Sequence, residues 1–127
     1  MLKNSKPIIL IPTVQKEKAL VFYRDVLGLT FKADDGFALV FEAGENMLRI
    51  TSVKEFAPHP FAVLGWEVDE IALAVRSLAE KGVEFERYNF PWMKQDELGV
   101  WTAPEGTKVA WFKDPDGNLL SVTQHAK

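Results

Sequence analysis

Few side chains in this 127-residue sequence have the type and spacing that catalysis requires. The absence of cysteine excludes disulfides, thiol nucleophiles and thiolate metal sites. Of the two histidines, His59 lies between two prolines and His125 lies close to the end of the sequence. Neither histidine combines with a serine and a carboxylate in the arrangement of a hydrolase triad. The glycines are scattered at turns, so the clustered glycines of nucleotide-binding loops are absent.

Arg49 is the charged residue whose position points most directly to ligand binding. It lies in Asn46–Thr51, where apolar and polar residues alternate as in a strand with one face on a core. Arg49 and Thr51 share the other face, where a guanidinium can hold a carboxylate, phosphate or carbonyl group. The alternative is an ion pair with Glu42 or Glu67, or an edge position open to water.

Several carboxylates could include a general base, namely Glu42, Glu45, Glu67, Asp69 and Glu70. Acidic residues of this kind are more often helix caps and surface charges. Asp69 in particular is suited to cap a helix that we expect to follow it.

Four tryptophans provide a second indication of ligand binding. Trp111 lies on an expected strand with Val109 on the same face, and Trp101 lies in a segment without a counterpart earlier in the chain. Aromatic walls suit flat or apolar ligands. Tryptophans in small β-rich proteins are also common in cores and dimer contacts, and this alternative applies equally to Trp66 and Trp92.

The elements that must position these residues form an internal repeat. The hairpin Thr107–Gln124 turns at Asp114–Gly117, where aspartate, proline and glycine have the conformational preferences of a tight turn. The segment Val40–Thr51 follows the same plan. When it is aligned with the later hairpin, Arg49 and Ser121 occupy equivalent positions in the two copies. The chain therefore contains two copies of one unit.

Each copy is predicted to have the order β-α-β-β-β. In the first copy, strands are expected at Pro7–Val14, Thr30–Ala33, Phe37–Glu42 and Asn46–Thr51, with a helix that begins at or just after Thr13 and stops at Gly28. In the second copy, strands are expected at Phe61–Val68, Val83–Tyr88, Val109–Phe112 and Leu119–Thr123, with a helix between Asp69 and Gly82. The segment Asn89–Gly106 is an insertion in the second copy, and could be a lid or a dimer arm.

Neither copy could bury its sheet alone. We expect an α+β fold in which two βαβββ modules form a curved, eight-stranded mixed sheet, with helices outside and a central cleft inside. The predicted boundaries are about 7–52 for module one, 53–60 for the linker and 61–124 for module two, within a single domain spanning residues 1–127.

Charge and hydropathy narrow the range of partners. The net charge of −3 and the lack of a basic run give no electrostatic basis for binding nucleic acid. No apolar stretch approaches membrane-spanning length, and the first residues lack the apolar core of a signal peptide. We therefore expect a cytoplasmic protein with neither nucleic acid nor membrane as a partner.

Two motifs carry a family resemblance: the helix end Phe22-Tyr23 with Val26-Leu27-Gly28-Leu29, and the turn Phe112–Asn118. Together they resemble the vicinal oxygen chelate superfamily, which includes glyoxalase I, bleomycin-resistance proteins, fosfomycin-resistance enzymes and extradiol dioxygenases. The likeness spans essentially the whole chain. It implies the two-module fold, a cleft that Trp111 lines, and a homodimer, sometimes with exchanged modules.

Metal-dependent members that resemble this chain hold a divalent ion with one His or Glu from each of four strands. The resemblance places these positions at Ile8, Arg49, Ala62 or Val63, and Ser121, none of which is a histidine or a carboxylate. Apolar side chains cannot ligate a metal, and a cationic arginine would repel it. We therefore expect no metal and no cofactor.

The favoured hypothesis is a metal-independent protein that binds a small aromatic or amphipathic molecule, a drug or a metabolite, as bleomycin-resistance proteins bind drugs. Arg49 favours a ligand that is anionic or neutral. The expected ligand-binding residues are Ile8, Arg49, Thr51, Val63, Trp101, Val109, Trp111 and Ser121. One alternative is a metal-dependent lyase, dioxygenase or thiol transferase with displaced ligands, such as His125 with Glu42 or Glu67. Another is an enzyme that uses a carboxylate base without a metal.

Overall fold

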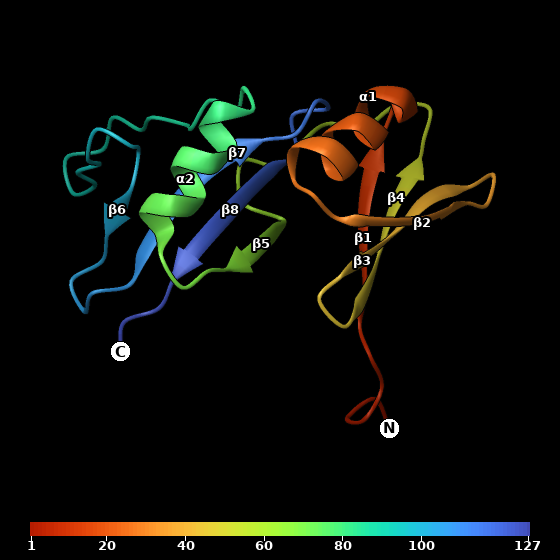
Figure 1. Ribbon diagram of the computed structural model, residues 1–127, viewed down its shortest axis with the longest axis horizontal. Helices are drawn as coiled ribbons and strands as arrows, with labels where there is room; N and C mark the ends of the chain where they lie inside the picture. Colours follow the sequence, from red (N-terminus) through yellow and green to blue (C-terminus); the bar gives the residue numbers. More distant parts are fainter. The chain divides into compact units, whose positions relative to one another are not determined.

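The computed structural model describes all 127 residues, which fold as two compact units, Met1–Pro58 and His59–Lys127. Each unit contains one four-stranded mixed sheet with helix on one face (Figure 1). The expected α+β class with two related modules is confirmed, and the eight strands form two sheets of four. The boundary between the units lies between Pro58 and His59.

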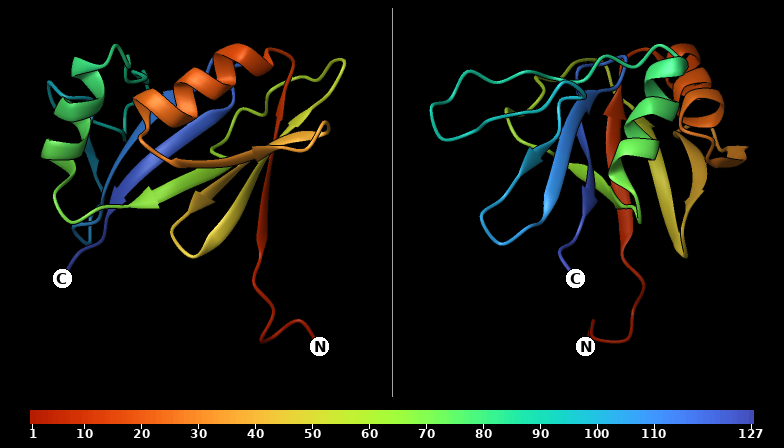
Figure 2. Two further views of the ribbon diagram at one scale, coloured as in Figure 1. Left: turned by 45° about the vertical axis from the view of Figure 1, so that its right-hand side comes forward. Right: turned by 60° about the vertical axis from the view of Figure 1, so that its left-hand side comes forward.

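In the first unit the sheet has the order β1-β4-β3-β2, with β1 parallel to β4 and the other pairs antiparallel. Its elements are β1 (Ile8–Thr13), α1 (Lys16–Val21), the π-helical turn η1 (Phe22–Val26), β2 (Thr30–Asp34), β3 (Ala38–Ala43) and β4 (Asn46–Ser52). Figure 2 shows α1 and η1 lying across one face of this sheet.

Tyr23 anchors the helix of the first unit to its sheet. Its side chain is fully buried and packs against Phe41 of β3, with ring centroids 6.0 Å apart. The helix ends as expected at Gly28, whose φ of +75° is a conformation that glycine adopts without a steric penalty. The amide of Leu29 then donates to the carbonyl of Tyr23, which closes the helix end.

In the second unit the sheet has the order β5-β8-β7-β6, and β5 runs parallel to β8. Its elements are β5 (Leu64–Glu67), α2 (Ile71–Glu80), β6 (Trp101–Thr102), β7 (Lys108–Lys113) and β8 (Leu119–Gln124). Two buried residues of α2, Ile71 and Val75, are spaced to lie on one side of the helix. They face the sheet, where Phe112 and Leu120 are also buried.

The prediction of a strand at Val83–Tyr88 is wrong. In that stretch only Phe85 forms an isolated bridge, to Phe112, and the amide of Glu86 donates to the carbonyl of Trp111 at 2.8 Å. The fourth strand of the sheet is instead β6, which comes from the insertion and pairs with β7 through Trp101 and Val109. Two short segments therefore share one edge of β7, so neither of them forms a long strand.

Two other predicted boundaries are corrected. The strand expected at Phe61–Val68 is shorter and begins at Leu64. The helix cap expected at Asp69 is wrong, because α2 begins at Ile71 and Glu70 occupies its cap position without a side-chain hydrogen bond. The amide of Ile71 donates instead to Oε1 of Gln124 at 2.8 Å, so the last residue of β8 supplies the cap.

The predicted turn at Asp114–Gly117 is present, and the side chain of Asp114 organises it. One carboxylate oxygen accepts from the amides of Asp116 and Asn118, each at 2.9 Å. The other accepts from the side-chain amide of Asn118, also at 2.9 Å. Asp114 and Asn118 are both buried, so this network sets the register in which β7 and β8 pair.

Candidate functional site

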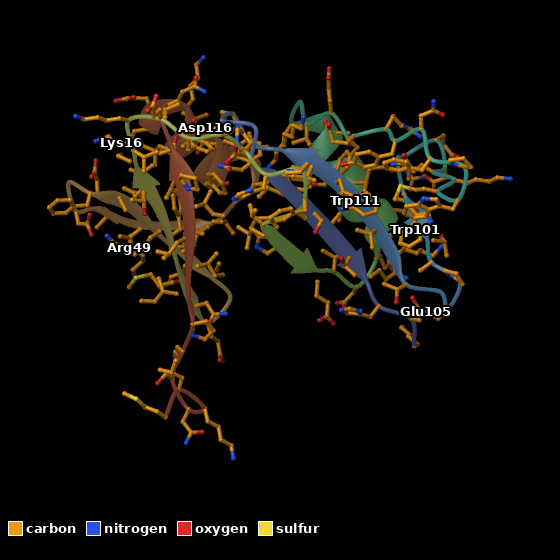
Figure 3. All side chains as sticks on the ribbon, turned by 180° about the vertical axis from the view of Figure 1, so that it is seen from behind. Lys16, Arg49, Trp101, Glu105, Trp111 and Asp116 are labelled. Carbon is orange, nitrogen blue, oxygen red and sulfur yellow. The ribbon has the colours of Figure 1, made fainter.

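The sheet of the second unit has an open face opposite α2, and four predicted site residues lie on it. Trp101 pairs with Val109 between β6 and β7, and Trp111 pairs with Ser121 between β7 and β8. Val109 and Trp111 are two positions apart on one strand and so point to the same side. The cross-strand register therefore brings together Trp101, Val109, Trp111 and Ser121. Figure 3 shows Trp101 and Trp111 close to one another on this unit.

The neighbours of Trp111 on this face are small. Ser121 lies beside it on β8, and Gly65 lies beyond Ser121 on β5. A side chain at position 65 would conflict with this arrangement, because a Cβ there would lie 2.6 Å from Oγ of Ser121. The indole of Trp111 thus has small neighbours on this face, although Ser121 itself is buried, with 9% of its surface exposed.

Five aromatic side chains, which we call the aromatic cluster, form a closed circuit of ring contacts around the two tryptophans. They are Tyr88, Phe90, Trp92, Trp101 and Trp111. Neighbouring ring centroids lie 6.0 Å apart for Tyr88 and Phe90, 5.6 Å for Phe90 and Trp92, and 5.8 Å for Trp92 and Trp101. The circuit closes at 6.2 Å between Trp101 and Trp111 and 5.5 Å between Trp111 and Tyr88.

The geometry within the aromatic cluster is of three kinds. Tyr88, Phe90 and Trp92 are stacked with nearly parallel planes. Trp111 meets Tyr88 edge to face, as Trp92 meets Trp101, and the planes of Trp101 and Trp111 are tilted by 33°. Phe90 is 50% exposed and Trp92 is 64% exposed. The prediction did not include Tyr88 and Phe90 as site residues. Their alternate spacing with Trp92, at positions 88, 90 and 92, was the available signal.

The environment of Tyr88 keeps its hydroxyl neutral. Burial raises the pKa of this phenol, and the nearby carboxylate of Glu86 raises it further. Glu86 also lies 3.5 Å from the ammonium of Lys113, a half-exposed pair that contributes little stability. The aromatic cluster is therefore uncharged at neutral pH, with one acidic group beside it.

In the first unit, Arg49 has a partner that the sequence did not reveal. Its guanidinium lies 2.8 Å from the carboxylate of Asp35, and Glu42 pairs instead with Lys32 at 3.2 Å. The pKa of Asp35 is lowered, first by the amides of Phe37 and Ala38 and then by Arg49. The positive charge of Arg49 is thus largely balanced, which weakens the case for an anionic ligand.

The other predicted site residues are divided between the two units. Thr51 shares the face of Arg49 on β4, and Ile8 on β1 is 55% exposed on the same side of the sheet. Val63 precedes β5, and its amide donates to the carbonyl of Leu119 at 2.9 Å. The structure therefore places Ile8, Arg49 and Thr51 on the first unit and Val63 with the tryptophans on the second.

The first unit also has a hollow of about 510 Å³ at the turn between β3 and β4. It is lined by Lys6, Lys32, Val40, Phe41, Glu42, Gly44, Glu45, Asn46 and Met47. None of these is among the expected ligand-binding residues, but Glu42 and Glu45 are two of the carboxylates considered as a general base. Glu42 is held in the ion pair with Lys32.

No group of three or more histidine, aspartate or glutamate side chains comes together as a metal-binding group in either unit. The positions that the resemblance assigns to metal ligands carry Ile8, Arg49, Ala62 or Val63, and Ser121. The residues present in these places do not fit a divalent ion.

Residues 8–122 match the Glyoxalase/Bleomycin resistance protein/Dioxygenase superfamily. The chain belongs to this superfamily, as its two related modules also indicate. No match was found among curated protein sequences. None of the helices is long and apolar enough to span a bilayer.

Solved structures with the same fold include a superfamily member from Sphaerobacter thermophilus, with 19% identity, a TM-score of 0.74 and coverage of 98% of this chain and all of that one. A glyoxalase family protein from Enterococcus faecalis has 22% identity, a TM-score of 0.72 and coverage of 97% and 99%. A lactoylglutathione lyase from Agrobacterium tumefaciens has 19% identity, a TM-score of 0.66 and coverage of 94% and 93%. At these identities the likeness establishes the fold.

Proposed function

We propose that this protein binds a small, flat aromatic molecule without a metal, and that the aromatic cluster of the second unit holds it. The observation that carries this proposal is the circuit of five rings with Trp101 and Trp111 on the open face of the sheet. The ligand would rest against Trp111 above Ser121 and Gly65, with Val109 as an apolar neighbour.

The exposure of the rings supports a binding role. Phe90 and Trp92 expose half or more of their surfaces, although burial of aromatic side chains is strongly favourable. An exposed group of large apolar side chains is typical of a surface that a ligand or partner covers. A stacked ligand ring would gain about 0.5–1.5 kcal/mol per aromatic contact beyond the burial of its area.

The character of the side chains favours a neutral ligand and a mechanism without metal. Arg49 is balanced by Asp35, so its charge does not require an anionic partner. The side chains at the positions expected to ligate a metal cannot do so, and the carboxylates Glu42 and Glu86 pair with lysines. Binding of a drug or metabolite needs no reactive group, which agrees with this set of residues.

Calorimetric titration with the neutral naphthalene probe Prodan tests the proposal. We expect saturable binding by the wild-type protein, and about tenfold weaker binding by Trp111→Leu or Trp101→Leu, since each removes one to two aromatic contacts. Trp66→Phe is the matched control, because Trp66 pairs with Val122 and so faces the α2 side of the sheet. Arg49→Met tests in parallel whether the first unit contributes.

Two outcomes would overturn the proposal. One is a wild-type protein that binds neither Prodan nor any member of a panel of planar aromatic compounds. The other is stoichiometric, saturable binding of Zn²⁺, Ni²⁺, Mn²⁺ or Fe²⁺ at micromolar concentration, which would point to a metal-dependent activity with displaced ligands.

A further inference from the structure

We infer that Gln95 and Arg87 are positioning residues that hold the insertion as a fixed wall of the aromatic-ligand site. This inference rests on the proposed function, and it assigns the insertion a role other than a moving lid. The residues concerned lie between Glu86 and Trp101, a stretch that contributes three of the five rings of the aromatic cluster before β6 begins.

The backbone of this stretch has little regular pairing of its own. Before β6 its only ladder contact within itself is the isolated bridge between Gln95 and Trp101. An irregular segment with few backbone hydrogen bonds is expected to open easily. Side chains must therefore supply the order that a strand would otherwise provide.

Gln95 supplies three such bonds from one half-buried carboxamide. Its Oε1 accepts from the amide of Tyr88 at 2.8 Å, and its Nε2 donates to the carbonyls of Glu86 and Gly99, each at 2.9 Å. The carboxamide thus joins the segment that enters the insertion to the segment that leaves it. Phe90 and Trp92 lie between these two attachment points.

Arg87 and Asp96 fix the returning segment. The guanidinium of Arg87 donates to the carbonyls of Asp96 and Glu97, the latter at 2.6 Å. One carboxylate oxygen of Asp96 accepts from the amides of Leu98 and Val100, each at 2.9 Å. The chain then turns at Gly99, where φ is +90° and a Cβ would lie 3.2 Å from Cβ of Phe85.

Two buried apolar residues complete the attachment. Met93 and Val100 are each less than one tenth exposed, whereas Trp92, next to Met93, is largely exposed. Met93 is therefore directed inward and Trp92 outward. The rings of Phe90 and Trp92 are held in place by bonds that do not involve the rings, so the site is ordered before a ligand arrives.

The test compares Gln95→Met with Lys94→Met, an exposed neighbour in the same segment. Methionine keeps the length of the glutamine side chain and removes all three hydrogen bonds. We expect Gln95→Met to bind Prodan about tenfold more weakly, because the rings must then be ordered on binding. We expect it also to lose near-ultraviolet circular dichroism from the coupled rings, and to lose protection against hydrogen exchange at the amides of Tyr88 and Val100.

Arg87→Met should show the same three changes. Arg87→Lys should show them to a smaller extent than Arg87→Met, because an ammonium keeps the charge but cannot bond two carbonyls with the geometry of a guanidinium. Lys94→Met should match the wild type in every measurement. Prodan binding that is unchanged in Gln95→Met, or ring dichroism and exchange equal to those of Lys94→Met, would overturn the inference. Absence of Prodan binding in the wild type would overturn the proposed function instead, while the dichroism and exchange data would still show whether Gln95 and Arg87 order the rings.

Discussion

Replacement of Asp114 by alanine should destabilise the protein by about 3 kcal/mol, since it removes the centre of the turn between β7 and β8. The carboxylate accepts three hydrogen bonds, two from backbone amides and one from the side chain of Asn118. Asp114 is 6% exposed and Asn118 is 4% exposed, so the abandoned donors of Asn118 would lie out of reach of bulk water.

The magnitude follows from these contacts. A hydrogen bond to a charged group contributes about 1.5–3 kcal/mol, so these three bonds together correspond to about 4.5–9 kcal/mol before water replaces any of them. Residues 115–117 are half-buried, so water can replace the bond to the amide of Asp116, whereas the two donors of Asn118 stay covered. A loss of about 3 kcal/mol is then expected, which in a chain of this length corresponds to a fall in Tm of about 10 °C.

The assay is urea unfolding followed by far-ultraviolet circular dichroism, with Asp69→Ala as the matched control. Asp69 is an exposed aspartate that does not cap α2, so its replacement should change the free energy of unfolding by less than about 0.5 kcal/mol. The double variant Asp114→Asn with Asn118→Asp reverses the side-chain pair and should recover more than half of the loss seen in Asp114→Asn alone. A loss below about 1 kcal/mol in Asp114→Ala, or no recovery in the double variant, would refute the role assigned to this carboxylate.

Two further predictions concern the first unit. The pKa of the Asp35 carboxyl is lowered in the folded state, chiefly by the amides of Phe37 and Ala38. The ionised carboxylate therefore stabilises the fold at a pH above its pKa in the unfolded chain, and this stabilisation is lost as the pH falls through its pKa in the folded protein. Between about pH 4 and pH 2, unfolding free energies should therefore fall more steeply in the wild type than in Asp35→Asn, and parallel curves would contradict this assignment. We also expect a homodimer of 14.4 kDa chains, because Leu10 is 64% exposed and Met47 is 43% exposed on one face of the sheet; a single species of monomer mass in sedimentation equilibrium would contradict it.

The sequence correctly predicted the elements that depend on residues close together in the chain. The turn at Asp114–Gly117 and the helix end at Gly28 follow from the backbone preferences of the residues themselves. The alternation in β4 correctly indicated that Leu48 and Ile50 are buried and that Arg49 lies on the opposite face.

The errors concern partners that are distant in the sequence. Gln124 caps α2 across 53 positions, which no motif near Asp69 could reveal. Val83–Tyr88 has the residue types of a strand, but its place beside β7 is taken partly by Trp101 from the insertion. Local propensity could not decide between two segments that compete for one edge of a sheet.

The sequence by itself determined the α+β class, the duplication, and the pairing of Val109 with Trp111 on one face of their strand. These follow from residue type and from the period of two along a strand. The tertiary structure alone decided that Arg49 pairs with Asp35, that five rings form one cluster, and that Gln95 bonds the backbone of Tyr88, Glu86 and Gly99. The physical reason is that these contacts join residues from separate segments of the chain. Hydrogen bonds and ring contacts form only where folding brings suitable groups within a few ångströms of one another.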